Sequence, residues 1–151
     1  MQESPRENGA DDWIPDFGLS HTGTIGVTVA ARAEMLPMLR SVVETVLLTA
    51  DFTLDVVADV RVAIDEIVTA LVGAAEGVEV ACALRYDRHR VEVRVSALTS
   101  TADVLPKNSL SRHLLESMVD GLSIDYRADQ ALETYRMVVC FDRRRTGHWE
   151  W

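Results

Sequence analysis

One stretch near the middle of the chain decides the fold: residues 62–70 read Val-Ala-Ile-Asp-Glu-Ile-Val-Thr-Ala. Around this stretch apolar side chains recur at helical spacing, namely Val57, Val60, Ile64, Ile67 and Leu71. Positions three or four residues apart share one face of an α-helix. We therefore predict an amphipathic helix here, with Asp55 as its N-cap and Gly77 as the residue that ends it.

The sequence before this helix predicts a strand and another helix. Apolar residues alternate with small or polar ones from Ile25 to Ala31, which is the pattern of a half-buried strand. A helical pattern then runs from Met35 to Leu47. Pro37 fixes the start of that helix near Glu34, because proline is tolerated only in the first turn.

The sequence after the central helix predicts a hairpin, a third helix and two more strands. In chain order these elements cover residues 80–86, 91–95, 109–119, 124–126 and 135–141. Such an order favours an α+β fold: a two-layer sandwich with a mixed, mostly antiparallel sheet and the helices on one face.

Composition limits the function. The chain has 151 residues, enough for one domain, which we place at residues 24–145 between tails at 1–23 and 146–151. Its net charge of −9 argues against direct nucleic-acid binding, which needs clustered basic residues. No apolar run is long enough to cross a membrane and no secretory signal precedes the domain, so we expect a cytoplasmic protein.

The two cysteines, Cys82 and Cys140, each lie in an alternating apolar segment. Buried cysteine behaves as a small apolar residue, and we expect both thiols to be reduced. A redox pair stays open at this point, because sequence does not show whether the two side chains meet.

The central motif resembles that of the RsbW-type anti-sigma factors, and the short actinobacterial sigma-F antagonists in particular. These are members of the Bergerat-fold (GHKL, histidine-kinase-like) ATPase superfamily. Their helix reads roughly A-x-x-E-x-x-T-N-A, which the chain matches from Ala63 through Glu66 to Thr69. Residues 114–120, Leu-Leu-Glu-Ser-Met-Val-Asp, are similar to the family's L-I-E-S-L-M-D, and Thr134 stands where the family has Gly-Thr-Thr. The resemblance spans about residues 24–142.

The resemblance implies a regulator of transcription. Such a protein binds a stress-type sigma factor, is released by a STAS-type anti-anti-sigma protein, and commonly forms a homodimer. Arg40 matches a family arginine in the first helix that grips both partners, and a guanidinium suits this role because it binds a carboxylate in a fixed orientation. An arginine that merely covers the apolar side of its helix is the alternative interpretation.

The nucleotide site that the resemblance implies is degenerate at this sequence. The pocket positions are Glu66, Thr69, Ala70 and Thr134. Glu66 matches the catalytic base, but Ala70 replaces the asparagine that holds Mg²⁺, and a methyl group cannot bind that ion. The family's Asp-x-Gly-x-Gly is absent from residues 96–103, and its glycine-rich G-x-G-L is Ser-Leu-Ser-Arg at 109–112.

Two functions therefore remain open. One is a binding protein that sequesters a sigma factor without catalysis. The other is an active serine/threonine kinase that uses ATP and Mg²⁺ to phosphorylate its STAS antagonist. The loss at Ala70 favours the first. We interpret Asp65 and the run 143–145 as solvated residues, and His113 as a packing or edge residue and not a catalyst.

Overall fold

The computed structural model describes residues 22–145. In chain order its elements are β1 (Gly23–Ala30), the short 3-10 helix η1 (Ala33–Met35), α2 (Leu36–Thr49), α3 (Leu54–Gly73), β2 (Ala75–Tyr86), β3 (Arg90–Thr99), α4 (Leu110–Met118), β4 (Gly121–Asp129) and β5 (Thr134–Arg144). The tails expected at 1–23 and 146–151 lie outside the described residues except for residues 22 and 23, and Gly23 begins β1.

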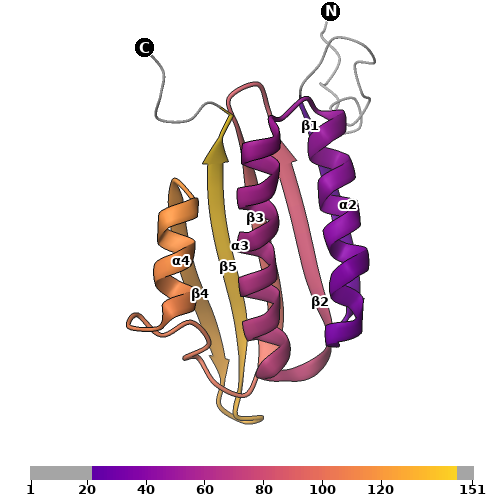
Figure 1. The fold of residues 1–151 in the computed structure, drawn as a ribbon. Coiled ribbons are helices and arrows are strands. Elements are labelled where there is room, and N and C mark those ends of the chain that lie inside the picture. Colours follow the sequence, from indigo (N-terminus) through magenta and orange to yellow (C-terminus); the bar gives the residue numbers. More distant parts are fainter. Residues whose placement is uncertain (1–21, 146–151) are drawn as a thin grey trace, which may run out of the picture.

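The five strands form one sheet in the order β1-β2-β3-β5-β4, and the three α-helices lie over one of its faces (Figure 1). This confirms the predicted two-layer α+β sandwich. Every neighbouring pair of described strands is antiparallel, so the expectation of a mixed sheet is wrong. Strands β3 and β4 do run in the same direction, but β5 lies between them and pairs with both.

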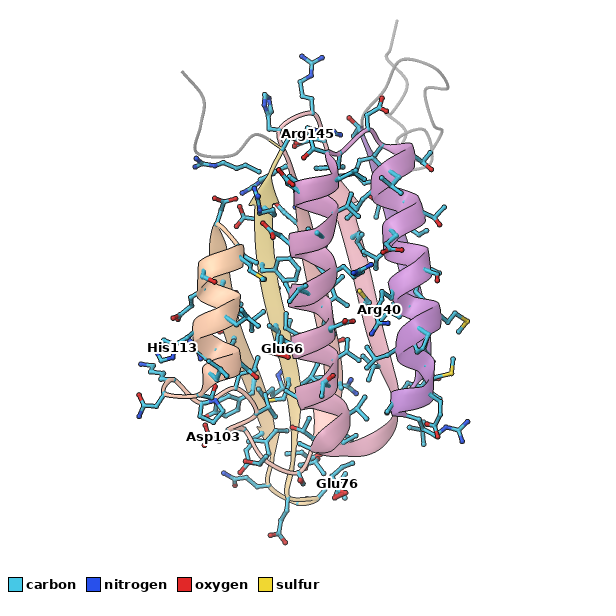
Figure 2. All side chains as sticks on the ribbon, viewed as in Figure 1. Arg40, Glu66, Glu76, Asp103, His113 and Arg145 are labelled. Atoms are coloured by element: carbon cyan, nitrogen blue, oxygen red, sulfur yellow. The ribbon has the colours of Figure 1, made fainter. Side chains whose placement is uncertain are left out.

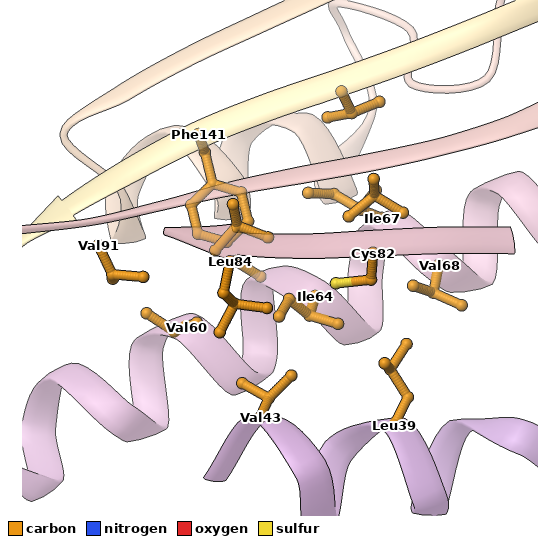
Figure 3. Close-up of a cluster of buried hydrophobic side chains, with 14 of the residues drawn as sticks. Leu39, Val43, Val60, Ile64, Ile67, Val68, Cys82, Leu84, Val91 and Phe141 are labelled. Atoms are coloured by element: carbon orange, nitrogen blue, oxygen red, sulfur yellow. The ribbon is translucent and has the colours of Figure 1, made fainter. Parts of the chain in front are cut away.

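The core fills the space between the helices and the sheet (Figure 3). Strand residues that face the helices alternate along the chain and are almost fully buried, namely Val80, Cys82, Leu84, Val91, Val93, Val95, Met137, Val139 and Phe141. The helices contribute Leu39, Val43, Leu47, Val60, Ile64, Ile67 and Leu71. Each large apolar side chain buried in this way stabilises the fold by about 1.5–3 kcal/mol.

The ends of α3 differ from the prediction. Thr53, not Asp55, is the N-cap, and its hydroxyl accepts a hydrogen bond from the backbone N–H of Val56. The helix can begin this early because Asp51 adopts a left-handed conformation (φ 66°), which turns the chain sharply after α2.

The glycine predicted to end α3 has another role. The helix ends at Gly73 with Ala74 as its C-cap, and Gly77 lies within β2. A Cβ atom at Gly77 would come within 3.0 Å of the Cβ atom of Leu98, so glycine permits a close approach of two strands there.

The two cysteines face opposite sides of the sheet. Cys82 lies under the helices, whereas Cys140 lies on the other face and two strands away, and both thiols are free. Two strand spacings amount to about 9.6 Å, which exceeds the Cα separation that a disulfide allows. The structure therefore excludes the intramolecular redox pair. No described helix is both long and apolar enough to span a membrane.

Candidate functional site

The motif residues lie on α3, near the middle of the helical layer (Figure 2). Glu66 is half-buried and makes no hydrogen bond or ion pair with any residue in 22–145. Thr69 is exposed, and Ala70 packs partly against the core. The i, i+4 spacing puts Glu66 and Ala70 on one helix face, as the motif requires, but Ala70 offers no polar atom beside the Glu66 carboxylate.

Thr134 opens β5, a strand against which α3 packs. It is only 9% exposed. Its hydroxyl oxygen is the one buried side-chain polar atom without a hydrogen-bond partner in the described part of the chain. The residue before it, Glu133, adopts a left-handed conformation (φ 55°).

The segment between β3 and α4 replaces the family's glycine-rich motifs and is fastened to the core. Thr99 is fully buried and donates its hydroxyl hydrogen to the carbonyl of Thr101 at 2.7 Å. Leu105 is buried in the core, and Arg112 donates to its carbonyl oxygen at 2.9 Å. Serines replace both glycines of this motif, and Arg112, at the position of its leucine, holds the segment in place.

Arg40 projects from α2 toward α3 (Figure 2), where Asp65 binds it through two contacts. Its Nε donates to one carboxylate oxygen at 3.2 Å, and an Nη atom lies 3.1 Å from the other. The interpretation of Asp65 as a solvated residue is therefore wrong. The side chains remain 37% and 29% exposed, so a binding partner can still reach this pair.

The outer side of α2 carries no charge. The helix has only two charged residues, Arg40 and Glu44, and both form ion pairs with α3, the second of them with Arg61. Arg40 and Glu44 are only partly exposed, whereas the most exposed residues of α2 are uncharged and partly apolar. Met38 is 48% exposed and Leu48 is 47% exposed.

Two of the three C-terminal arginines contact the rest of the domain, contrary to the interpretation of the run as a solvated end, whereas Arg144 is exposed. Arg143 donates two hydrogen bonds to Asp59 of α3, at 3.0 and 3.3 Å, and its side chain is only 13% exposed. The guanidinium of Arg145 lies 3.7 Å from the centre of the Phe52 ring, and partial burial lowers the pKa of this group. These contacts join the end of the sheet to the helical layer.

His113 is exposed on α4, and one of its ring nitrogens contacts the Ser109 carbonyl at 3.0 Å. No group of three or more His, Cys, Asp or Glu side chains that could hold a metal ion occurs within residues 22–145.

The chain is similar to known proteins both in sequence and in fold. No family model matches the chain. Over 115 residues it is 33% identical to proteins described as anti-sigma-F factor RsbW in two strains of Mycobacterium tuberculosis, a match that covers 75% of this chain and 68% of theirs. A crystal structure of the RsbU and RsbW domains of a Mycobacterium tuberculosis protein matches with a TM-score of 0.60 at 19% identity. That match covers 82% of this chain and 32% of the solved chain, so this chain spans about a third of its length. On the identity and coverage of the first match, the chain belongs to the RsbW family of anti-sigma factors.

Proposed function

We propose that this chain sequesters a stress-type sigma factor through the exposed side of α2, and that a STAS-type anti-anti-sigma protein releases the sigma factor by competing for the same surface. The observation that carries this proposal is the uncharged outer face of α2. Family membership supplies the class of partner, since the relatives are described as anti-sigma-F factors.

The α2 face has the chemistry of a protein-binding surface. Met38 and Leu48 are ten residues apart, about 15 Å along the helix axis, and both expose about half of their side chains. Ser41 and Thr45 lie exposed between them and add no charge. Apolar anchors within a surface free of charge are typical of the centre of an interface, where burial of charged groups is costly.

Arg40 gives this surface an electrostatic border. Asp65 already holds its guanidinium in a fixed orientation, and more than a third of the side chain is exposed. A carboxylate of the partner can therefore bind the outward N–H groups without first ordering a flexible side chain. Arg40 can therefore bind a partner, as the matched family arginine does, and at the same time pair with Asp65 within the fold.

We further propose that binding of the sigma factor requires neither Mg²⁺ nor ATP or ADP. Mg²⁺ requires oxygen ligands, and Ala70 presents a methyl group where the family has an amide. Asp65, the adjacent carboxylate, is engaged by Arg40. The segment from Thr99 to Arg112 packs against the core through Leu105. The residues present therefore do not fit a magnesium–nucleotide complex, and we assign no step to one.

Serine kinase activity is the second candidate, and two observations favour it. Glu66 is a half-buried carboxylate without a partner among residues 22–145, and the buried hydroxyl of Thr134 has none either. Calorimetric titration with ATP and ADP, with and without Mg²⁺, separates the two candidates. Mg²⁺-dependent binding in the micromolar range that Glu66→Ala weakens would overturn the nucleotide-free proposal, and a phosphotransfer assay on a STAS partner would then test the kinase alternative.

Strand β1 is the basis for a proposed homodimer in the cytoplasm. It forms one edge of the sheet, and its eight residues, Gly23–Ala30, carry no charge and no proline. Natural proteins usually protect such an edge with charge, proline or a covering element. Pairing with a second copy would protect it. Sedimentation equilibrium of the wild-type chain and of Thr28→Lys tests this proposal, because lysine on the edge should shift the population to monomer.

The sigma-factor proposal is tested by titrating the chain with the purified sigma-F-type factors of its own organism. Met38→Glu and Leu48→Glu should each weaken binding about tenfold or more, since each buries a charge at the centre of the interface. The control is Leu110→Glu on α4, a leucine that is more exposed than either but lies on another helix. Equal affinity of all three variants would rule out the α2 surface.

A further inference from the structure

A groove of about 590 Å³ lies on the face of the sheet opposite the helices. Residues from all five strands line it, with Thr24 as the contribution of β1. On this face the side chains of neighbouring strands stand in register, and one row across the sheet consists of Gly26, Ala83, Arg94, Cys140 and Ser123. Most members of this row are small. Within the described chain this face has no helix over it, so its small side chains leave room for large ones from elsewhere.

Three arginines and two carboxylates line the groove, so it carries a small excess of positive charge, although the protein as a whole is acidic. Arg85 and Arg90 line one end and share Glu92 as an ion-pair partner, at 2.6 Å in each case, and Arg90 also pairs with Asp142 at 3.4 Å. Arg94 lies in the middle of the groove, is exposed, and makes no ion pair or hydrogen bond with any residue in 22–145. An unpaired guanidinium on a floor of small side chains favours an occupant that brings carboxylates and bulky apolar groups together.

One segment of this same chain has that composition. Residues 11–17 read Asp-Asp-Trp-Ile-Pro-Asp-Phe, with three aspartates, two aromatic residues and no basic residue. The described chain begins at the groove: Thr24 lines it, and Thr22 lines a smaller hollow beside Arg85 and Arg90.

The chain length is sufficient to reach across the groove. Cys140 lies three strand spacings from β1, about 14 Å across the sheet, in the row of Gly26. Gly26 itself is four residues beyond Thr22, about 13 Å along the strand. Nine residue steps separate Trp13 from Thr22, and they span up to about 30 Å when extended. Either aromatic side chain of the segment can therefore lie on the small residues of the floor.

We propose that residues 11–17 dock in this groove of their own chain, with Trp13 and Phe17 over the small residues and the aspartates directed at Arg94. The tethered segment has a high effective concentration at the groove, so even weak contacts hold it in place. Docked there, it covers the sheet face that is otherwise open to a second copy or to another protein. This inference does not depend on the α2 surface proposed for the sigma factor, which lies on the opposite layer.

The two cysteines provide a direct test. Cys140 lies in the groove, whereas Cys82 is buried under the helices, where burial raises its pKa to about 12 and keeps its thiol protonated. The reaction of the folded full-length chain with a disulfide reagent at pH 8 therefore reports the exposure of Cys140. Mass spectrometry of the labelled chain confirms which thiol has reacted.

The proposal predicts that the double variant Trp13→Ser, Phe17→Ser reacts about tenfold faster than the wild type, the factor for a contact closed roughly nine-tenths of the time. Replacing Asp11, Asp12 and Asp16 by asparagine should also raise the rate, and added salt should raise it in the wild type. All of these substitutions lie outside residues 22–145. The matched control is Trp149→Ser, Trp151→Ser at the other end of the chain, which should leave the rate unchanged.

Two results would overturn the proposal. Equal rates in the wild type and the Trp13/Phe17 variant would mean that the segment does not cover Cys140. Protection that grows with protein concentration would mean that a second copy, and not the chain's own segment, occupies the groove.

Discussion

Thr134→Val tests whether the buried hydroxyl of Thr134, one of the motif positions, lacks a hydrogen-bond partner. The hydroxyl of Thr134 is buried without a partner among the described residues, and valine replaces it with a methyl group of nearly the same shape. Burial of an unpaired hydroxyl costs about 1–3 kcal/mol, and its removal should return most of that amount to the free energy of unfolding. Valine also suits a strand at least as well as threonine does.

The control is the same substitution at Thr99, for which we expect a change of opposite sign in the free energy of unfolding. Thr99 and Thr134 are the two buried polar residues of the described chain, but the Thr99 hydroxyl donates to the Thr101 carbonyl. Thr99→Val loses that hydrogen bond and should lower the free energy of unfolding by about 0.5–1.5 kcal/mol. The two variants should therefore differ by roughly 1.5–4.5 kcal/mol.

Urea unfolding followed by circular dichroism measures both variants at equilibrium. For a domain of this size each kcal/mol corresponds to about 2–6 °C in Tm, so thermal scans provide a second measurement. If Thr134→Val destabilised the protein as much as Thr99→Val does, the Thr134 hydroxyl would have a partner in solution. The reasoning about an orphaned group at the family's nucleotide position would then be refuted.

Three further predictions concern stability. Arg143→Ala should lower the free energy of unfolding by about 1–3 kcal/mol, because the ion pair with Asp59 is mostly shielded from water. Arg85→Ala removes a highly exposed ion pair and should lower it by less than about 1 kcal/mol. Equal losses of the two variants in urea unfolding would contradict this. Burial raises the pKa of Cys82 from 9.0 to about 12, so unfolding favours ionisation and stability should fall as pH rises from 9.0 to about 12. An unchanged pH slope in Cys82→Ala would show that another group is responsible. Glu133→Gly should raise the free energy of unfolding by about 0.5–1 kcal/mol, since glycine adopts the left-handed conformation without strain. A loss of stability in the same assay would show that the Glu133 side chain contributes more than the strain costs.

The order of elements followed from the sequence because each pattern was local. Alternation identified the strands, helical spacing identified the helices, and Pro37 placed the start of α2 within a few residues. These signals depend only on which residues must face the core. The partner of each strand is a tertiary property, and this explains why the sequence predicted a mixed sheet where every pair of described strands is antiparallel.

The cap of α3 shows the limit of local reasoning. Thr53 and Asp55 are both good N-cap residues, so composition does not choose between them. The left-handed Asp51 decides, because it turns the chain early enough for the helix to start at Leu54. Gly77 was misread for a similar reason: glycine suits a helix end and also a close strand contact, and the contact with Leu98 is not visible in sequence.

The site was predictable only as far as the motif reaches. The match at Glu66 and the substitution at Ala70 are visible in the sequence, since a missing amide needs no coordinates. The ion pairs do not, because Arg40 and Asp65 are 25 residues apart and Arg143 and Asp59 are 84 apart. Pairing over such separations requires the packing of α2 on α3 and of α3 on β5, which no single segment encodes.

The most direct test of the central claim is calorimetric titration of the wild-type chain with a sigma-F-type factor of its organism, with and without Mg²⁺ and ATP. A protein that sequesters its partner without nucleotide should bind with the same Kd in both buffers, and Met38→Glu should weaken binding in both. Binding that occurs only with Mg²⁺ and ATP, or that tightens tenfold or more when they are added, would contradict the account.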